Sequence, residues 1–511
     1  MGKNKYKILL FIMNAIAMSL ELVASRILSP YFGNTNMVWT SVIGIILFST
    51  SIGNYLGGRI SDKKEFKEDF KNILRLDMLF IAIFILLIPF INEKILQSIV
   101  YSITNEKIGA IIGTIILFLI PNIFIGILSP LILKYELIKN EKEDNIGKIS
   151  GNIYAIGTLG SIVGTFASGF WLVPFFGAKN ILFVLTIICL LVMLLIIEKN
   201  DRKKETLHYI LFIAILIVLL AIYIYKDNSA SQKVLNGDVD AVLSLDTEYG
   251  TVKIYNDHNF LGYIRVLEID GGAETISYYD EEHKYDVIKD SYYDYFQRTI
   301  RNNDKINNTL LIGGAGYVFP RYYISHFADK TLDVVEIDNK ITEIAKKYFF
   351  LDDLIKDYDL NNNKRLNIIH DDGRLYVNNN VDKKYDLILN DAFIGRNPVK
   401  TLCTLEFFQN VERSLTDDGI YAINIISSLE GKGSRLLRAE VNTLKKVFKN
   451  VVCVKLIQND DDSFVDNILV IASNGEFNIP DGGTVYDLKL DENEIILTDD
   501  YCPVEIIGDN H

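Results

Sequence analysis

The first half of the chain is dominated by apolar runs that are long enough to cross the hydrocarbon core of a bilayer, which is about 30 Å thick. Short polar breaks separate these runs, and the pattern predicts transmembrane helices. We predict seven spans, at residues 8–29, 38–58, 73–91, 108–134, 153–175, 180–197 and 207–225. The first run is longer than the apolar segment of a signal peptide and lacks a small-residue cleavage site, so we expect it to be retained.

The two halves of the chain differ in charge. Residues 1–226 carry 22 Lys and Arg against 15 Asp and Glu, and residues 227–511 carry 30 against 50, which gives net charges of +7 and −20. We therefore expect an all-α polytopic membrane domain over residues 1–226 and a different, acidic domain after it. The negative charge of the second half argues against nucleic-acid binding, because phosphate contacts need cationic side chains.

Polar residues within the membrane half suggest a further role. Glu21 and Arg26 lie in or at the edge of the first predicted span, where charges are costly and usually face a protein or water-filled interior. The two residues are a functional polar pair, or they have separate structural roles. In the second case the Arg26 side chain extends to the membrane–water interface and Glu21 fixes helix packing. Gly160 and Gly164 form a GxxxG motif that predicts close helix contact.

The four cysteines are Cys189, Cys403, Cys453 and Cys502. Their spacing has no CxxC motif and therefore indicates neither a zinc site nor a disulfide framework. We expect no bound metal.

The second half alternates between apolar strands and helical stretches. Short alternating runs near residues 239–272 predict a small antiparallel sheet, and a helix is expected through "YYDYFQRTIR". The later strands are fully apolar, which predicts a mostly parallel sheet with helices on both faces. We expect a small β-subdomain over residues 227–300 and a Rossmann-like domain of the class I methyltransferase type over residues 301–511.

Glycines and carboxylates fall at the predicted carboxyl ends of these strands, where ligands of such sheets bind. They are Gly313, Gly314 and Gly316 after the first strand, Glu336 and Asp338 after the second, Asp371, Asp372 and Gly373 after the third, and Asp391 after the fourth. Glycines allow the backbone to approach a ligand, although GGxG is not the GxGxxG phosphate fingerprint. The carboxylates can accept hydrogen bonds from ribose hydroxyls and from an adenine amino group, and one of them can face the reacting centre.

This set of carboxylates argues against a dinucleotide, because a pyrophosphate would meet several negative charges with only Arg321 nearby. A ligand with ribose, adenine and a cationic group suits the predicted site better. S-adenosylmethionine and decarboxylated S-adenosylmethionine both fit this description. The alternative is that the strand-end Asp residues cap helices.

The segments "LLIGGAGYVFPRYYISHF", "LDVVEID", "HDDGRLYV" and "YDLILNDAF" resemble the spermidine synthase, or polyamine aminopropyltransferase, family. The segment "ELVASRILSPYFGNTNMVWTSVIGIILFSTSIGNYLGGR" resembles the membrane-fused branch of that family. The resemblance implies that Glu336 holds the ribose, that Asp372 holds the adenine and that Asp391 lies beside the attacking amine. We expect Tyr293 or Tyr295 to wall the pocket, with core or surface packing as the alternative, and we group Tyr293 with Asp391 as a catalytic candidate.

The sequence also departs from the family pattern. Soluble members carry GGGDG, whose Asp grips the aminopropyl amine, and Gly316 stands at that position here. Ile394 replaces the second Asp of D-x-x-D, Gly250 replaces an expected Gln, and Asp294 is the polar residue of the Y-H/Q-E helix. Nucleoside recognition is thus kept, whereas amine recognition is eroded. We expect Glu274, Asp294 and Tyr295 to line the substrate side.

The resemblance implies a membrane-bound transferase that uses an adenosyl sulfonium donor and releases methylthioadenosine. Alternatives are an S-adenosylmethionine-dependent methyltransferase, an enzyme that cleaves S-adenosylmethionine, and a nucleoside sensor or transporter. The expected partners are an amine or nucleoside substrate, the lipid bilayer and a second copy in a homodimer.

The expected location is the cell membrane, with several crossings. Lys and Arg collect in "GKNKYK" and in alternate loops, so the positive-inside rule and an odd number of spans place residues 227–511 outside. The supply of nucleotides instead favours the cytoplasm, and the side of the membrane stays open at this point.

Overall fold

The chain divides into two compact units. The computed structural model describes residues 4–33, 36–103, 105–140, 146–173, 178–194, 240–247, 249–259, 261–394, 397–456 and 461–508. The first unit comprises Met1–Lys233 with Leu243–Val252, and the second comprises Val234–Val242 with Lys253–His511.

The first unit is helical. Its helices are α1 (Lys5–Phe32), α2 (Asn36–Ser61), α3 (Phe66–Ser102), α4 (Glu106–Lys139), α5 (Ile146–Ala167), which continues into the π-helical turn η1 (Ser168–Leu172), and α7 (Ala178–Leu194). Among the described residues, five helices are long and apolar enough to cross a membrane, and they cover the first four predicted spans and residues 153–172 of the fifth. The run 108–134 lies within one helix, α4, although Pro121 and Pro130 fall inside it.

The prediction of seven spans is not confirmed. The sixth predicted span, 180–197, overlaps α7, but the apolar helix found there, Asn180–Met193, is shorter than the other candidates. The seventh, 207–225, lies outside the described residues. The sequence pattern therefore identifies the apolar segments. Among the described residues, five of these segments form helices that are long enough to be candidate spans.

Close helix contact occurs at the predicted GxxxG motif. A Cβ atom added at Gly160 of α5 would lie 2.1 Å from the carbonyl oxygen of Phe11 in α1, and one added at Gly164 would lie 2.3 Å from that of Ala15. Any side chain at these positions would force the two helices apart. Both glycines thus allow α1 and α5 to pack backbone against backbone.

The predicted polar pair lies on α1. Glu21 and Arg26 are both partly exposed within the unit. Nearby on the same helix, the buried Ser19 hydroxyl accepts a hydrogen bond of 2.7 Å from Ser168 in η1. A joint role of Glu21 and Arg26 stays a prediction.

The chain after α7 forms a small sheet and a large one, and Leu243–Val252 of the small sheet are assigned to the first unit. The small sheet has the order β1-β2-β3-β4, formed by β1 (Asp240–Asp246), β2 (Thr251–Asn259), β3 (Gly262–Ile269) and β4 (Gly272–Tyr278). Strands β3 and β4 are antiparallel, as the alternating sequence predicts. Helix α9 (Tyr292–Arg301) follows and covers the predicted "YYDYFQRTIR".

The large sheet has the order β14-β12-β13-β11-β8-β5-β6-β7 among the described residues. Its strands are β5 (Asn308–Ile312), β6 (Thr331–Glu336), β7 (Leu366–His370), β8 (Tyr385–Asn390), β11 (Leu415–Ser427), β12 (Asn450–Lys455), β13 (Asp466–Ser473) and β14 (Thr484–Tyr486). Pairs from β7 to β11 are parallel, whereas β13 is antiparallel to β11 and β12, and β14 is antiparallel to β12. The sheet is therefore mixed, and the predicted parallel arrangement holds for the strands from β11 to the edge strand β7.

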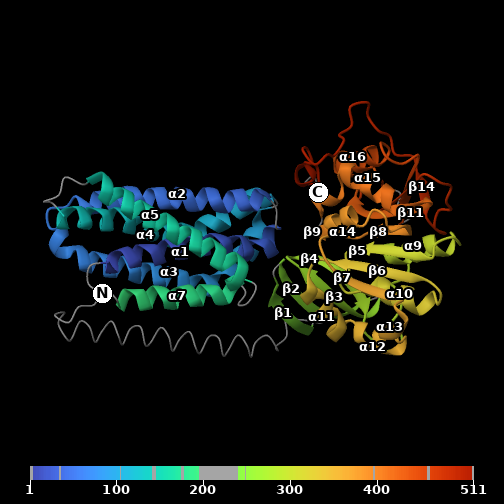
Figure 1. The fold of residues 1–511 in the computed structure, drawn as a ribbon, viewed down its shortest axis with the longest axis horizontal. Coiled ribbons are helices and arrows are strands. Elements are labelled where there is room, and N and C mark those ends of the chain that lie inside the picture. The colour runs from blue at the N-terminus through green and yellow to red at the C-terminus, as the bar shows by residue number, and fades with distance from the viewer. Residues whose placement is uncertain are drawn as a thin grey trace. The chain divides into compact units, whose positions relative to one another are not determined.

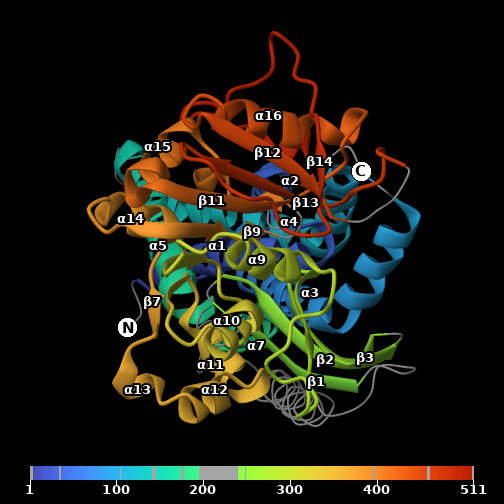
Figure 2. The same cartoon turned by 90° about the vertical axis from the view of Figure 1, so that its right-hand side faces the viewer.

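Helices cover both faces of this sheet, as Figures 1 and 2 show. One face carries α14 (Gly373–Asn379), α15 (Leu405–Ser414) and α16 (Arg435–Leu444), which share a buried apolar cluster with the sheet. The other face carries α9, α10 (Val318–His326) and α11 (Asn339–Tyr348). The remaining elements are α12 (Leu351–Asp357), α13 (Leu360–Asn363), β9 (Phe393–Ile394), β10 (Asn397–Pro398), the 3-10 turns η2 (Lys400–Leu402) and η3 (Lys432–Ser434), and α17 (Val504–Ile507).

We predict that Gly160→Ala weakens the helical unit, because the added methyl group overlaps the α1 backbone. Overpacking of this kind costs about 1–3 kcal/mol. Gly151→Ala, on the same helix, is the matched control, because an added Cβ there has no atom within 4 Å. The measurement is the thermal unfolding of the detergent-solubilised chain. Equal unfolding temperatures for the two variants would contradict the close packing of α1 and α5.

Candidate active site

The four strand ends that carry the predicted ligand residues lie side by side. In the parallel register, Ile312 at the end of β5 pairs with Val335 of β6 and with Asn390 of β8. Glu336 at the end of β6 pairs with His370 of β7. The structure therefore brings the segments that follow β5, β6, β7 and β8 to one edge of the sheet, as the topology of parallel strands requires.

The glycine loop after β5 passes very close to the end of β8. Gly313 has a φ of +94°, and a Cβ atom there would lie 2.5 Å from the carbonyl oxygen of Asp391. The loop also holds Ala315 and Tyr317 in the left-handed region, at φ of +40° and +53°. A left-handed conformation is unfavourable for residues with a Cβ, so the surrounding contacts must hold this loop.

The carboxylate of Glu336 supplies such contacts. Its Oε2 accepts hydrogen bonds from the backbone N–H groups of Gly314 and Ala315, at 2.9 and 3.0 Å, and its Oε1 accepts one of 2.9 Å from Asp338. Burial raises the pKa of Glu336, while these three hydrogen bonds oppose the increase. Glu336 thus ties the glycine loop to the end of β6, and its contact with a ribose stays a prediction.

Two of the strand-end Asp residues cap helices. The carboxylate of Asp338 accepts a hydrogen bond from Lys340 N at the start of α11, and that of Asp372 accepts one from Leu375 N at the start of α14. The Asp371 carboxylate in turn accepts a hydrogen bond of 2.8 Å from Asp372 N. Capping, the alternative that the sequence left open, therefore does occur, and it fixes these carboxylates at the sheet edge.

Gly373 opens α14 directly after this pair of carboxylates. A Cβ atom at Gly373 would lie 2.5 Å from the side chain of Ile312, so the helix starts against the end of β5. A second network lies beneath the loop, where the Thr342 hydroxyl contacts the Tyr317 hydroxyl at 2.8 Å and His370 Nε2 at 3.0 Å. These contacts hold Tyr317 in its left-handed conformation.

Gly316 meets a residue of the small sheet that the sequence did not single out. The Thr275 hydroxyl of β4 accepts a hydrogen bond of 2.9 Å from Gly316 N. A Cβ atom at Gly316 would lie 2.5 Å from Thr275 Cγ2, and Thr275 is buried. The space that a side chain at position 316 needs is therefore filled from β4.

Asp391 lies beside two tyrosines of α9. The Tyr292 hydroxyl donates a hydrogen bond of 3.2 Å to Asp391 Oδ2. Loss of hydration in the protein interior raises the pKa of Asp391 to about 7, while hydrogen bonds from Tyr293 and Tyr292 lower it. Because burial and the nearby Asp391 carboxylate disfavour a phenolate, the pKa values of both tyrosines are raised. The predicted pair of Asp391 and Tyr293 is thus brought together, with Tyr292 as a third member.

Glu274 of β4 adds another carboxylate to this group. Burial, followed by the charges of Asp391, Glu336 and Asp270, raises the pKa of Glu274 well above its usual value. The predicted residues Glu336 and Asp391 therefore act electrostatically on Glu274. A group of carboxylates this close together disfavours an anion and favours a cationic ligand.

The other two predicted substrate residues are engaged on a different side of α9. The Asp294 carboxylate accepts hydrogen bonds from Gln297, Asp290 N and Arg298. The Tyr295 hydroxyl donates to Leu456 O at 2.9 Å, and the guanidinium of Arg298 lies over the Tyr295 ring. These contacts stabilise the helix and its neighbours, and a role for Asp294 and Tyr295 in binding substrate stays a prediction.

Arg321, the cation that the sequence placed nearest to the site, is fully buried. Its Nη2 donates to the Ser277 hydroxyl at 2.6 Å, its Nε donates to Tyr317 O at 3.2 Å, and its Nη1 donates to Lys284 O. Burial lowers the pKa of Arg321 to about 10. This guanidinium thus joins α10, β4 and the segment before α9 through neutral acceptors.

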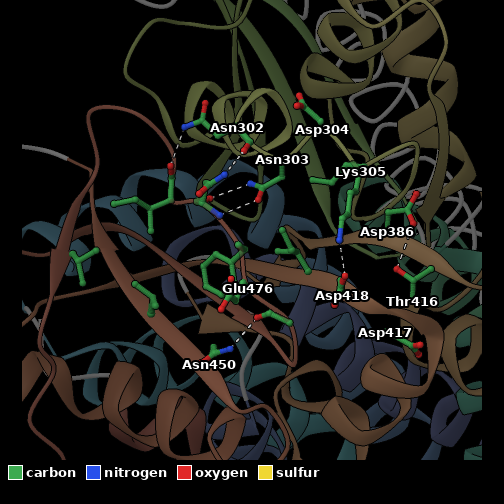
Figure 3. Close-up of a pocket in the computed structure, with 18 residues that line it drawn as sticks. Asn302, Asn303, Asp304, Lys305, Asp386, Thr416, Asp417, Asp418, Asn450 and Glu476 are labelled. Carbon is green, nitrogen blue, oxygen red and sulfur yellow. Dashed lines mark hydrogen bonds and ion pairs between the residues drawn. The ribbon is translucent and has the colours of Figure 1, made fainter.

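A hollow of about 990 Å³ lies at the other edge of the sheet, where β5, β8 and β11 begin. Figure 3 shows Lys305 directed at Asp418, with an ion pair of 2.7 Å, and Asp386 beside Thr416. Asp386 also accepts hydrogen bonds from the N–H groups of Asn307 and Asn308. Because it lies at the opposite ends of the strands from the four strand ends described above, this hollow is separate from the candidate site. Among the described residues, no group of His, Cys, Asp and Glu suits a metal ion.

Comparison with known proteins matches this half of the chain. Residues 297–457 match the family described as spermine/spermidine synthase domain. A polyamine aminopropyltransferase of Methanocaldococcus jannaschii is 39% identical over 113 residues, which cover 22% of this chain and 36% of the relative. One of Thermoplasma volcanium is 26% identical over 215 residues, which cover 42% of this chain and 71% of the relative. The chain thus spans about a third of the length of the first of these curated relatives.

Among solved structures, a probable spermidine synthase from Corynebacterium glutamicum has a TM-score of 0.40 at 16% identity, over 52% of this chain and 97% of that one. The family match falls on the segment that contains the glycine loop, the strand-end carboxylates and Asp391. Residues 297–457, in the C-terminal half of this chain, therefore match a spermine/spermidine synthase domain.

Proposed function

We propose that the protein is a membrane-bound transferase of the aminopropyltransferase type. The donor in this proposal is an adenosyl sulfonium, decarboxylated S-adenosylmethionine or S-adenosylmethionine, and the by-product is methylthioadenosine. The observation that carries the proposal is the group of Glu274, Glu336 and Asp391 at the strand ends, with a pKa of about 7 for Asp391. The five apolar helices of the first unit support the membrane location.

The donor supplies a carbon that is activated by the neighbouring sulfonium. The amine nitrogen forms a bond to that carbon with its lone pair, and the carbon–sulfur bond breaks so that its electron pair remains on sulfur. The nitrogen must be neutral to attack, because an ammonium has no lone pair. In this proposal Asp391 accepts the proton that the nitrogen loses, and its pKa of about 7 suits a base that works near neutral pH.

The other residues have separate tasks. The glycine loop, held by Glu336, presents backbone to the nucleoside, and Asp372 at the start of α14 is available to the adenine. Glu274 and Glu336 favour the cationic groups of donor and acceptor. Tyr292 and Tyr293 orient Asp391 and cover one side of it. Most of the rate acceleration would come from this positioning, because a sulfonium is a good leaving group.

Gly316 supports a second candidate. With Thr275 in the space of a side chain at position 316, no carboxylate can extend from the loop to a donor amine. Discrimination against the carboxylate of S-adenosylmethionine is then weaker, and methyl transfer or cleavage of S-adenosylmethionine without an acceptor is the alternative reaction.

The products distinguish these reactions. The full chain in detergent is incubated with S-adenosylmethionine or its decarboxylated form, with and without putrescine, and the products are measured by mass spectrometry. We expect methylthioadenosine only when an amine is present. Methylthioadenosine without an amine would indicate cleavage, S-adenosylhomocysteine would indicate methyl transfer, and no turnover would favour a sensor or transporter.

We predict that Asp391→Asn lowers the rate of methylthioadenosine release by about 10²-fold or more, because the amide cannot accept the proton. Asp382→Asn, an exposed position before β8, is the matched control and is expected to keep the rate. Binding of methylthioadenosine to both variants, measured by calorimetry, tests that the site is intact. A rate unchanged in Asp391→Asn would exclude Asp391 as the base.

The rate is expected to rise with pH through about 7, because Asp391 acts in its ionised form. Tyr292→Phe removes a hydrogen bond that favours the ionised form, so the pKa of Asp391 rises and the midpoint of the profile moves to higher pH. Tyr486→Phe is the matched control, because the Tyr486 hydroxyl donates to a different carboxylate, Glu430. A shift to lower pH in Tyr292→Phe would contradict this assignment.

Thr275 and Gly316 are expected to be coupled. Gly316→Ala places a methyl group against Thr275 Cγ2 and is expected to cost about 1–3 kcal/mol of stability. Thr275→Ser removes Cγ2 and keeps the hydroxyl that accepts from Gly316 N. The double variant should recover part of the loss, measured by thermal unfolding and by methylthioadenosine binding. If the losses of stability in the two single variants simply add in the double variant, the contact with Thr275 does not restrict the side chain at position 316.

A further inference from the structure

Two cysteines that are 99 residues apart in the sequence are neighbours in the second unit. Cys403 Sγ and Cys502 Sγ are 3.6 Å apart, and both side chains are buried. Cys403 lies between the turn η2 and helix α15, and Cys502 precedes α17 near the C-terminal end. Sequence spacing alone indicated no disulfide, because it cannot reveal a contact over this separation.

Hydrogen bonds hold the two cysteines and the segments next to them in place. Lys400 O accepts a hydrogen bond from Cys403 Sγ at 3.2 Å and one from Cys502 Sγ at 3.5 Å. Close to Cys502, the Asp499 carboxylate accepts hydrogen bonds from the Arg374 guanidinium and from the Thr404 hydroxyl. The two segments are thus fixed to each other on either side of the sulfur atoms, so the sulfurs meet in a defined position.

The surroundings favour a thiolate at one of the two sulfurs. A hydrogen bond from Cys403 lowers the pKa of Cys502, against the effect of burial, and the charge of Lys400 acts in the same direction. The nearby Glu440 is fully buried, and burial raises its pKa to about 8, so it is mostly uncharged at neutral pH. A neutral Glu440 does not repel a thiolate at Cys502.

We propose that Cys403 and Cys502 are an oxidation site, at which a low-molecular-weight disulfide converts the two thiols into an intramolecular disulfide. The Cys502 thiolate attacks one sulfur of the small disulfide and releases one thiolate. Cys403 loses its proton and attacks the Cys502 sulfur of the mixed disulfide, which releases the second thiolate. The two cysteines are oxidised, and the small disulfide is reduced to two thiols. The sulfur atoms must approach each other by about 1.5 Å to reach bonding distance.

This disulfide would secure the C-terminal segment beside the candidate site. Leu402, next to Cys403, accepts a hydrogen bond through its backbone oxygen from the Asn390 side chain, at 3.3 Å. Asn390 directly precedes Asp391. Arg374, which holds Asp499, is the second residue of α14 and follows Asp372 and Gly373. The bond would therefore restrain the segments that carry two of the strand-end carboxylates.

The full chain in detergent is treated with oxidised glutathione, free thiols are alkylated after denaturation, and the digest is mapped by mass spectrometry. We expect a peptide that joins Cys403 to Cys502 and that dithiothreitol separates. Because the bond closes a loop of about 100 residues, the unfolding temperature of the second unit should rise by about 5 °C or more. These readouts need no enzyme activity, so they are independent of the proposed function.

Cys453 is the matched control. It is also buried in the second unit, and burial raises its pKa to about 12. Cys453→Ser should leave both the joined peptide and the temperature shift, whereas Cys502→Ser should abolish both. Alkylation of both Cys403 and Cys502 after oxidation, or a glutathione adduct that never resolves to the joined peptide, would overturn the proposal. The mapping of the unchanged chain gives this answer even if a variant fails to fold.

Discussion

The candidate site depends on one buried carboxylate. Glu336, at the end of β6, accepts hydrogen bonds from two backbone N–H groups of the glycine loop and from Asp338 N. These bonds hold a loop in which Ala315 and Tyr317 adopt left-handed backbone conformations. Without this carboxylate, the loop would lose the contacts that offset its backbone strain. The hydrogen bonds of Glu336 thus also fix the position of the glycine loop against Asp391.

The charge of the site follows from the way its groups are partnered. Burial and the charges of Asp391 and Glu336 raise the pKa of Glu274, whereas the buried Arg321 is held by neutral acceptors. A cationic ligand would relieve this excess of carboxylates. The small sheet contributes to the same edge, because β4 carries both Glu274 and Thr275. The small sheet and the large sheet thus both contribute residues to the candidate site.

Much of the fold could be predicted because its signals are local. The fully apolar strands predicted a parallel sheet, and the central strands are parallel; the antiparallel strands β13 and β14 have no distinct local pattern. The apolar runs predicted the helices of the first unit, and five of the seven predicted spans correspond to helices long enough to cross a membrane among the described residues. In α9, residues two positions apart have different partners: Tyr292 contacts Asp391, whereas Asp294 pairs with Arg298. Helical spacing alone does not show which side faces the site.

The sequence by itself determined which residues stand at the strand ends. A glycine loop after one apolar strand and carboxylates after the next three suffice for this, because parallel strands all end at the same edge of the sheet. Only the tertiary structure decided what those groups contact. It placed Thr275 against Gly316, assigned Asp338 and Asp372 to helix caps, and brought Cys403 to Cys502. These contacts join residues from separate elements, and their distance in space depends on how the sheets and helices pack, which no local pattern records.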